Sequence, residues 1–232
     1  MNITIFGANG PTGQILTRRA LADGHEVSAF TRHPEAFPRL EGDLRVVGGD
    51  VLDGDAVEAA VAGRDAVVST LGVPFGRSPV SVYSIGVAHM IEAMGRHGVK
   101  RLVCVSSSTM APHPEPQGGL IFRKVMQPYV VNVLGRTVYD DMHRMEDVVR
   151  DSDVDWTIVR PSGLFGAGRV TDYEVAADAI LGRFTAREDL ADCLLRQVED
   201  RTYVGTALAV ATVEVQPSMV TLIWREGIRK KA

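Results

Sequence analysis

The residues whose types and spacing suggest chemistry begin with three glycines near the start of the chain. Gly7, Gly10 and Gly13 directly follow the apolar run Ile3–Phe6, with the spacing GxxGxxG. The first glycine permits a tight turn, the second lets the backbone approach a diphosphate, and the third lets a helix pack on a strand. A helix starting here offers free N–H groups and a partial positive charge to phosphates. The residues expected to hold a dinucleotide pyrophosphate are Gly7, Asn9, Gly10, Pro11, Thr12 and Gly13.

The end of the second predicted strand carries a positive charge. An NAD-preferring protein places an acid here, about 20 residues beyond the glycines, to bind the ribose hydroxyls. This chain has Thr31 and Arg32 instead. Because a guanidinium attracts a 2′-phosphate that an acid would repel, Arg32 predicts NADP(H) as the preferred cofactor, with NAD(H) as the alternative. The competing interpretation is an exposed arginine without a ligand.

Segments after the third and fourth predicted strands extend this site. Asp50 and Val51 would meet the adenine edge by side chain and backbone. Thr70, Leu71 and Gly72 lie where the backbone would line the cofactor.

An alternation of strands and helices must position these residues. Strands are predicted at Ile3–Phe6, Glu26–Thr31, Leu44–Val47, Ala66–Thr70, Arg101–Ser106 and Asp155–Val159. Helices are predicted at Thr12–Ala22, Asp55–Ala62, Val80–His97, Val138–Arg150 and Arg187–Val198. This alternation is typical of βαβ units. It predicts an α/β fold with a single Rossmann-type doubly wound parallel sheet.

The 232 residues predict one domain, with a cofactor-binding core at 1–160 and a C-terminal substrate-side and packing segment at 161–232. After Pro161 the alternation loosens, and a helix and the strand-like Thr202–Val215 are too short for an independent core. We interpret them as a small C-terminal appendage. The irregular segment Met110–Gly135 contains four prolines, and a substrate lid is one hypothesis for it.

Composition excludes several classes of function. The formal net charge of -4 gives no basic field for nucleic acid. Cys104 and Cys193 are expected to be buried thiols, and no metal-ligand spacing occurs. Met1 stands too near the first strand for a signal peptide, and no apolar run approaches the roughly 20 residues of a membrane span. We expect a cytoplasmic protein without a membrane partner.

Several separate stretches match a known family: the glycine turn, Thr31-Arg32, Gly49-Asp50-Val51, Leu71-Gly72, Ser106-Ser107-Ser108 and Asp155–Pro161. Together they resemble atypical short-chain dehydrogenase/reductases of the NmrA-like type. Within that group the chain is most similar to the biliverdin reductase B/flavin reductase family. The stretches that carry this narrower likeness are Asp65-Ala66-Val67-Val68, Ser78-Pro79, Asp140-Asp141, Arg144-Met145 and Glu188-Asp189-Leu190.

The resemblance implies roles for the later residues. Ser106 and Pro161 would flank the cofactor, and Ser107 would lie beside the nicotinamide, where it orients the amide or the acceptor. Ser108 matches the serine of the broader dehydrogenase pattern, and Tyr139 its tyrosine. That pattern places a lysine four residues after the tyrosine, whereas this chain has His143. A Tyr139–His143 pair on one helix face would be a proton relay, although two structural residues are the simpler interpretation.

Two functions remain open. The first is an NADPH-dependent oxidoreductase that transfers a hydride to a flavin or similar planar conjugated acceptor, as a monomer or homodimer. The second, implied by the NmrA-like resemblance, is a redox sensor that binds NADP(H) without turnover. A conventional carbonyl or sugar-nucleotide dehydrogenase is disfavoured because the lysine is missing.

Overall fold

Alternating strands and helices run through most of the chain. The structure is a computed structural model that describes residues 1–76, 78–111, 135–180, 182 and 184–215. In chain order the elements are β1 (Asn2–Phe6), α1 (Pro11–Ala22), β2 (Glu26–Thr31), η1 (Pro34–Ala36), β3 (Leu44–Gly48), α2 (Gly54–Val61), β4 (Ala66–Ser69), α3 (Val82–His97), β5 (Arg101–Val105), η2 (Ser108–Met110), α5 (Arg136–Arg150), β6 (Asp155–Pro161), β7 (Gly163–Phe165), β8 (Tyr173–Ala177), β9 (Phe184–Ala186), α6 (Arg187–Glu199) and β10 (Thr206–Thr212). The first six predicted strands and the five predicted helices are confirmed.

The main sheet has the strand order β3-β2-β1-β4-β5-β6-β10-β8. Strands β1 to β6 pair in parallel. The chain moves outward from β1 to β3 and then returns to β4 on the other side of β1. The boundary between the paired strands β1 and β4 is therefore the topological switch point. Open α/β sheets bind ligands at such a point, outside the carboxyl ends of the strands. The predicted doubly wound fold is confirmed.

The C-terminal segment joins the main sheet. Strand β10 pairs in parallel with β6, and β8 then pairs antiparallel with β10, so the sheet is parallel except at this edge. Six of the seven residues of β10 are buried. Because an apolar strand gains most when both of its faces are covered, the segment predicted as an appendage instead extends the sheet. A separate two-stranded sheet joins β7 and β9.

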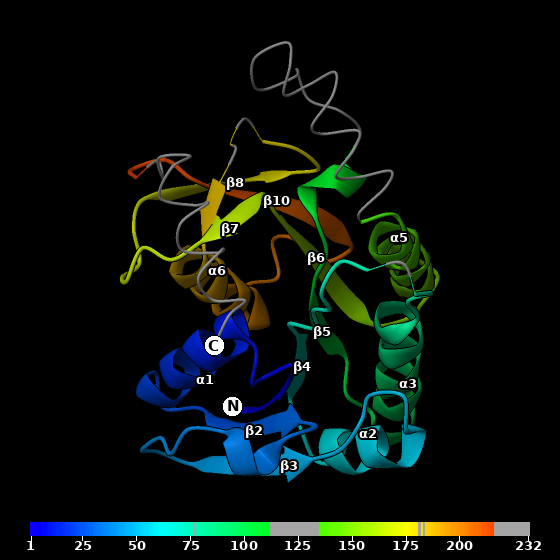
Figure 1. Ribbon diagram of the computed structural model, residues 1–232. Helices are drawn as coiled ribbons and strands as arrows, with labels where there is room; N and C mark the ends of the chain where they lie inside the picture. Colours follow the sequence, from blue (N-terminus) through cyan, green and yellow to red (C-terminus); the bar gives the residue numbers. More distant parts are fainter. Residues whose placement is uncertain (77, 112–134, 181, 183, 216–232) are drawn as a thin grey trace.

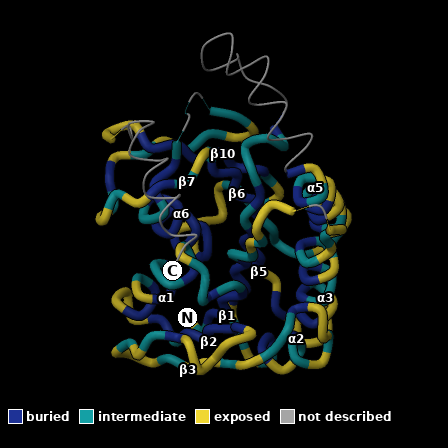
Figure 2. Tube along the Cα trace, in the orientation of Figure 1, coloured by how far each residue is buried: buried dark blue, intermediate teal, exposed yellow. Residues whose placement is uncertain are grey.

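Helices cover both faces of the sheet (Figure 1). Helices α1 and α6 lie on one face, and α2, α3 and α5 lie on the other (Figure 1). Along β1, Ile3 and Ile5 pack in the cluster shared with α1 and α6, whereas Phe6 packs in the opposite cluster. This alternation follows from the period of two in a strand. Figure 2 shows that buried residues are concentrated in the sheet and on the inner sides of the helices.

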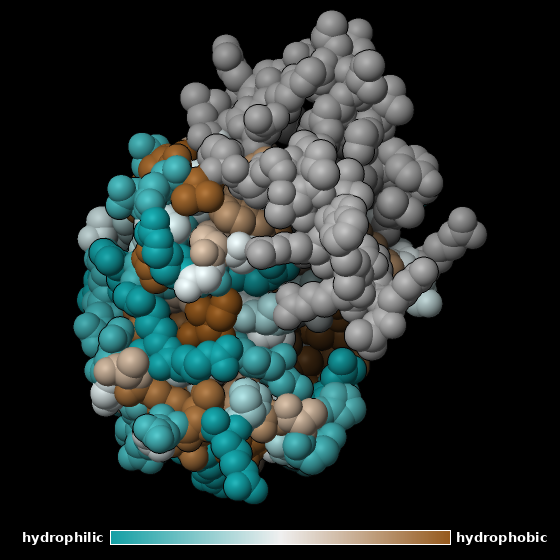
Figure 3. Space-filling view, turned by 60° about the vertical axis from the view of Figure 1, so that its left-hand side comes forward, coloured by the Kyte–Doolittle hydropathy of each residue, from teal (hydrophilic) through white to brown (hydrophobic). Residues whose placement is uncertain are grey.

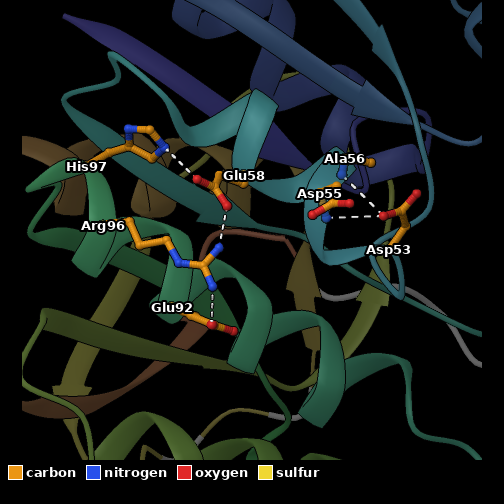
Figure 4. Close-up of polar contacts among 7 residues, drawn as sticks. All are labelled: Asp53, Asp55, Ala56, Glu58, Glu92, Arg96 and His97. Atoms are coloured by element: carbon orange, nitrogen blue, oxygen red, sulfur yellow. Dashed lines mark hydrogen bonds and ion pairs between the residues drawn. The ribbon is translucent and has the colours of Figure 1, made fainter.

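Polar contacts fasten α2 to its neighbours (Figure 4). Asp53 caps the helix by accepting hydrogen bonds from the N–H groups of Asp55, at 3.1 Å, and Ala56, at 3.3 Å. Arg96 of α3 forms ion pairs with Glu58 of α2 and with Glu92. These pairs are largely exposed and therefore contribute little to stability.

The surface that carries α1 and α6 is mostly hydrophilic, and its apolar side chains form small separate groups (Figure 3). Scattered apolar residues of this kind are normal on a protein surface. Within the described residues, no helix combines the length and the apolar character needed to cross a membrane.

Candidate functional site

The glycine turn lies at the switch point between β1 and β4. Gly7 has a φ of 74°, a region that other residues rarely adopt. A Cβ atom on Gly7 would lie 2.7 Å from the carbonyl oxygen of Thr70, and one on Gly13 would lie 2.4 Å from the carbonyl oxygen of Gly7. Both positions therefore require glycine, the first for the turn and the second for packing of α1.

The start of α1 is a backbone cradle. Gly10 is the N-cap, Pro11 is the first helical residue, and no side chain of the N-cap satisfies the helix end. The first-turn N–H groups have no partner within the helix. Two hydrogen bonds fix the position of Asn9, because Gln14 Nε2 donates to its carbonyl oxygen and to its Oδ1, both at 3.1 Å. A Cβ atom on Gly10 would lie 3.2 Å from the carbonyl oxygen of Gly7. This uncapped, glycine-lined end fits a phosphate.

Arg32 follows β2 at the same edge of the sheet. Its side chain is exposed and, in the described part of the chain, makes no hydrogen bond or ion pair. Thr31 beside it is buried, and its Oγ1 accepts a hydrogen bond from the N–H of His33 at 3.1 Å. The guanidinium is thus available to a ligand while the residue before it is fixed.

Residues after β3 and β4 meet on α3. Gly86 of α3 allows close approach, because a Cβ atom there would lie 3.2 Å from side-chain atoms of Val51 and Leu71. Asp50 accepts a hydrogen bond from the N–H of Leu52 at 3.1 Å, so its carboxylate holds its own turn. His89 Nδ1 is hydrogen-bonded to the carbonyl oxygen of Val51 at 2.9 Å. The sequence did not suggest His89, because no local pattern links it to residue 51.

Thr70 fastens β4 to the glycine turn. Its Oγ1 donates to the carbonyl oxygens of Phe6 and Gly7, at 3.0 and 3.2 Å. Gly72 is exposed, and a Cβ atom there would meet nothing within 4 Å. The side chain at 70 therefore supports the turn, whereas the segment after it lies open at the surface.

Ser107 lies just beyond β5 and caps the short helix η2. Its Oγ accepts hydrogen bonds from the N–H of Thr109 at 3.3 Å and from the Oγ1 of Thr109 at 3.0 Å. Ser108 is the first residue of η2, and Ser106, two residues before it, is buried. Pro161 is buried at the end of β6, the strand that follows β5 across the sheet.

Tyr139 on α5 is half-buried, and its pKa is affected by Ser107. Burial raises the pKa of the Tyr139 phenol, and the neighbouring hydroxyls of Ser107 and Thr109 lower it in part. Its ring lies 5.7 Å, centroid to centroid, from that of Phe75, which is 51% exposed. Tyr139 therefore packs against an exposed aromatic ring, and its pKa responds to two hydroxyls from the end of β5. Of the two candidate serines, Ser107 is the one that affects the pKa of Tyr139.

The alternative of a Tyr139–His143 proton relay can be compared with the structure. His143 is exposed, and within the described residues no hydrogen bond links it to Tyr139. The structure therefore gives no direct hydrogen bond that would carry a proton between these two described side chains, and the relay stays a hypothesis.

A buried ion pair fixes α5 two turns beyond Tyr139. Arg160 of β6 donates to Glu146 through Nε at 3.0 Å and Nη2 at 2.6 Å. Burial raises the pKa of Glu146, but hydrogen bonds from Arg160 and Arg150, together with the positive charge of Arg160, outweigh it and lower the pKa overall. The pair therefore connects α5 to the sheet beneath the Ser107 end of β5.

Asp141 of α5 caps α3. Its fully buried carboxylate accepts from the N–H of Tyr83 at 2.9 Å and from the Oγ of Ser84 at 2.5 Å. The Tyr83 hydroxyl in turn accepts from the N–H of Val73 at 3.1 Å. The start of α3 is thus occupied by a carboxylate, and the loop after β4 is held by Tyr83.

Two further sequence hypotheses concern a substrate lid and metal binding. Most of the predicted lid, residues 112–134, lies outside the described residues. Among the residues that are described, no group of three or more His, Cys, Asp or Glu side chains is arranged to hold a metal ion.

Comparison with known proteins gives a family. A family model described as NAD(P)H-binding matches residues 7–201. An uncharacterized protein of Mycobacterium tuberculosis, Rv2047c, is 28% identical over 72% of this chain, but the match spans only 15% of that protein's length. The sugar epimerase YhfK of Bacillus subtilis, itself uncharacterized, is 26% identical over 87% of this chain and 89% of its own. The 3-beta-hydroxysteroid dehydrogenase of Mycolicibacterium neoaurum is 25% identical over 77% of this chain and 52% of its own.

Solved structures share the fold. A short-chain dehydrogenase/reductase from Veillonella parvula, solved in complex with NADP, superposes with a TM-score of 0.74 at 19% identity, over 94% of this chain and 99% of that one. The oxidoreductase ylbE from Lactococcus lactis gives a TM-score of 0.75 at 19% identity, over 100% of this chain and 96% of its own. At these identities the likeness establishes a Rossmann-type fold.

Proposed function

The chain belongs to this NAD(P)H-binding family, and on that premise we propose that it is a reductase that prefers NADPH to NADH. The observation that carries the proposal is the uncapped glycine cradle at the switch point, with the exposed guanidinium of Arg32 at the end of the neighbouring strand. We place the protein in the cytoplasm, as a monomer or homodimer.

The cofactor would lie across the carboxyl edge of the sheet. The start of α1, from Gly7 to Gly13, would hold the pyrophosphate, and Arg32 would hold the 2′-phosphate. Asp50 and Val51 would border the adenine. The segment Thr70–Gly72, together with Ser106 and Pro161, would border the nicotinamide end. Since β3, β2, β1, β4, β5 and β6 are successive neighbours in the sheet, these segments follow one another along its edge.

The chemistry would take place beside Ser107 and Tyr139. When bound, the reduced nicotinamide supplies a hydride to the acceptor. The Ser107 hydroxyl would donate a hydrogen bond to an acceptor oxygen, and Tyr139 would deliver its phenolic proton to that oxygen. Burial raises the pKa of Tyr139, so the phenol keeps its proton at neutral pH and acts as an acid. This protonation state suits reduction, in which the acceptor oxygen takes up a proton.

We propose a planar conjugated acceptor that carries a carbonyl oxygen, with flavin as the first candidate. The exposed ring of Phe75, paired with Tyr139, offers an aromatic edge against which a conjugated ring could pack. A simple ketone or aldehyde is the second candidate. It is supported by the effect of the Ser107 hydroxyl on the pKa of Tyr139, because two neighbouring hydroxyl donors suit a single carbonyl oxygen.

A steady-state screen tests the proposal. Oxidation of NADPH is followed by absorbance with free flavin, a quinone and a ketone in turn, using wild-type protein and Tyr139→Phe. We expect turnover with flavin or quinone, and a loss of activity in Tyr139→Phe. Turnover with the ketone alone would select the second candidate. Tight NADPH binding without turnover on any acceptor would overturn the reductase proposal in favour of a redox sensor.

A further inference from the structure

The hydroxyl of Ser107 has both of its acceptor positions filled by one residue. Thr109 donates to Ser107 Oγ through its N–H at 3.3 Å and through its Oγ1 at 3.0 Å. A serine hydroxyl has one proton to donate and two lone pairs to accept with. Because both lone pairs face donors, the proton of Ser107 is what remains for another partner.

Thr109 also affects the third hydroxyl of the cluster. The hydroxyls of Ser107 and Thr109 both lower the pKa of the Tyr139 phenol, which comes from α5. Thr109 is partly exposed and lies in η2, directly after the end of β5. Its side chain is therefore hydrogen-bonded to the residue at the end of a strand and also affects the pKa of a residue on a separate helix.

We propose that Thr109 is a positioning residue: by donating its hydroxyl proton to Ser107, it leaves the Ser107 proton directed at the oxygen of the bound acceptor. No bond to hydrogen breaks at Ser107, which only donates a hydrogen bond, while the transferred proton comes from Tyr139. This inference rests on the proposed function, because it assumes an acceptor oxygen beside Ser107.

The simpler role for the same contacts is local. A serine that caps η2 needs only the hydrogen bond from the backbone N–H of Thr109, which any residue at 109 except proline retains. The proposal instead needs the Thr109 Oγ1. Thr109→Val removes that oxygen with little change of shape, and Thr109→Ser keeps it, so the two roles separate.

The first test uses turnover. We expect Thr109→Val to lower kcat by about tenfold, the equivalent of one hydrogen bond, and Thr109→Ser to restore it. The effect of Thr109→Val should vanish in a Ser107→Ala background and persist in a Tyr139→Phe background. An equal fall in the Ser107→Ala background, or wild-type kcat in Thr109→Val, would overturn the proposal.

The second test needs no cofactor and no turnover. Three-bond Hα–Hβ couplings of Ser107, measured by NMR on the free protein, report its side-chain rotamer. We expect one rotamer in wild type and Thr109→Ser, and averaged couplings in Thr109→Val. A single rotamer in Thr109→Val would contradict the inference. Failure of the wild type to turn over any acceptor would count against the proposed function, whereas these couplings decide the role of Thr109 independently.

Discussion

Gly7 packs directly against the backbone of Thr70, so that a Cβ atom on the glycine would lie 2.7 Å from the threonine carbonyl oxygen. The Thr70 hydroxyl also donates a hydrogen bond to the carbonyl oxygen of Gly7 at 3.2 Å. The two residues end neighbouring strands, β1 and β4, that lie on the two sides of the switch point. The glycine turn is therefore built from two segments that are distant in sequence.

The packing of the glycine turn predicts a steric effect at position 13. In Gly13→Ala the new Cβ would lie 2.4 Å from the carbonyl oxygen of Gly7, which is backbone and cannot move aside cheaply. We expect a loss of about 1–3 kcal/mol in the free energy of unfolding, as for other overpacked sites, together with weaker NADPH binding. Urea unfolding and NADPH titration measure the two effects.

Gly95→Ala is the matched control. Gly95 is exposed on α3, and a Cβ atom there would meet nothing within 4 Å. Alanine should stabilise this helix by about 0.5–1 kcal/mol without changing cofactor binding. If both alanine variants behaved alike, the close packing at Gly13 would be refuted.

Tyr83 predicts a measurable hydrogen bond to the loop after β4. Tyr83→Phe removes the acceptor of the Val73 N–H, and we expect a loss of about 1 kcal/mol in the free energy of unfolding. Tyr203→Phe is the control, because its hydroxyl makes no hydrogen bond in the described part of the chain, and it should stay within about 0.5 kcal/mol of wild type. Equal effects of the two variants in urea unfolding would speak against this contact.

The Glu146–Arg160 pair predicts a large stability effect. The two side chains are 6% and 4% exposed, so Glu146→Gln leaves a buried guanidinium without its counter-charge. We expect a loss of about 3 kcal/mol in urea unfolding. Glu92→Gln, which breaks the exposed pair with Arg96, should leave stability unchanged (Figure 4). A neutral Glu146→Gln would show that the pair does not fix α5.

The same pair predicts a dependence on pH. The pKa of Glu146 is lowered in the folded protein, so its ionised form adds stability above the unfolded carboxyl value of about 4.3. That contribution is lost as the pH falls through the lowered folded pKa. Wild type should therefore lose more stability than Glu146→Gln on acidification. Parallel losses for the two proteins would contradict this.

Both cysteines are predicted to be unreactive in the folded protein. Burial raises the pKa of Cys104 and of Cys193 to about 12, so neither forms appreciable thiolate at neutral pH. A disulfide-exchange reagent should label neither thiol until denaturant is added. Rapid labelling of the native protein would show that one of these sites opens to solvent.

The sequence predicted the first six strands because each is a short apolar run with a helical pattern behind it. It did not predict where Thr202–Val215 would pair, because the alternation is loose after Pro161 and local pattern does not reveal a distant partner. The pairing of β10 with β6 depends on packing with α6, which only the folded chain provides.

The site residues likewise divide into those that local sequence pattern reveals and those that only the fold reveals. The glycine turn was predictable because its three glycines lie close together in the sequence. Thr109, His89 and Tyr83 were not, since each acts through a contact that no fixed spacing marks. In the sequence, Tyr139 was compared with a pattern that has a lysine at position 143, where this chain has histidine. In the fold, the groups that affect the pKa of Tyr139 are instead hydroxyls from the end of β5.

The affinity for NADPH and NADH, measured by calorimetry on wild type, Arg32→Asp and Arg45→Asp, tests the central claim most directly. Arg45 is exposed on the neighbouring strand β3, so it carries the same change of charge without lying at the predicted ribose site. We predict that Arg32→Asp weakens NADPH binding by about 2 kcal/mol, roughly 30-fold, and leaves NADH binding unchanged, while Arg45→Asp alters neither. Equal NADPH affinity in wild type and Arg32→Asp, or no binding of either nucleotide by the wild type, would contradict the account.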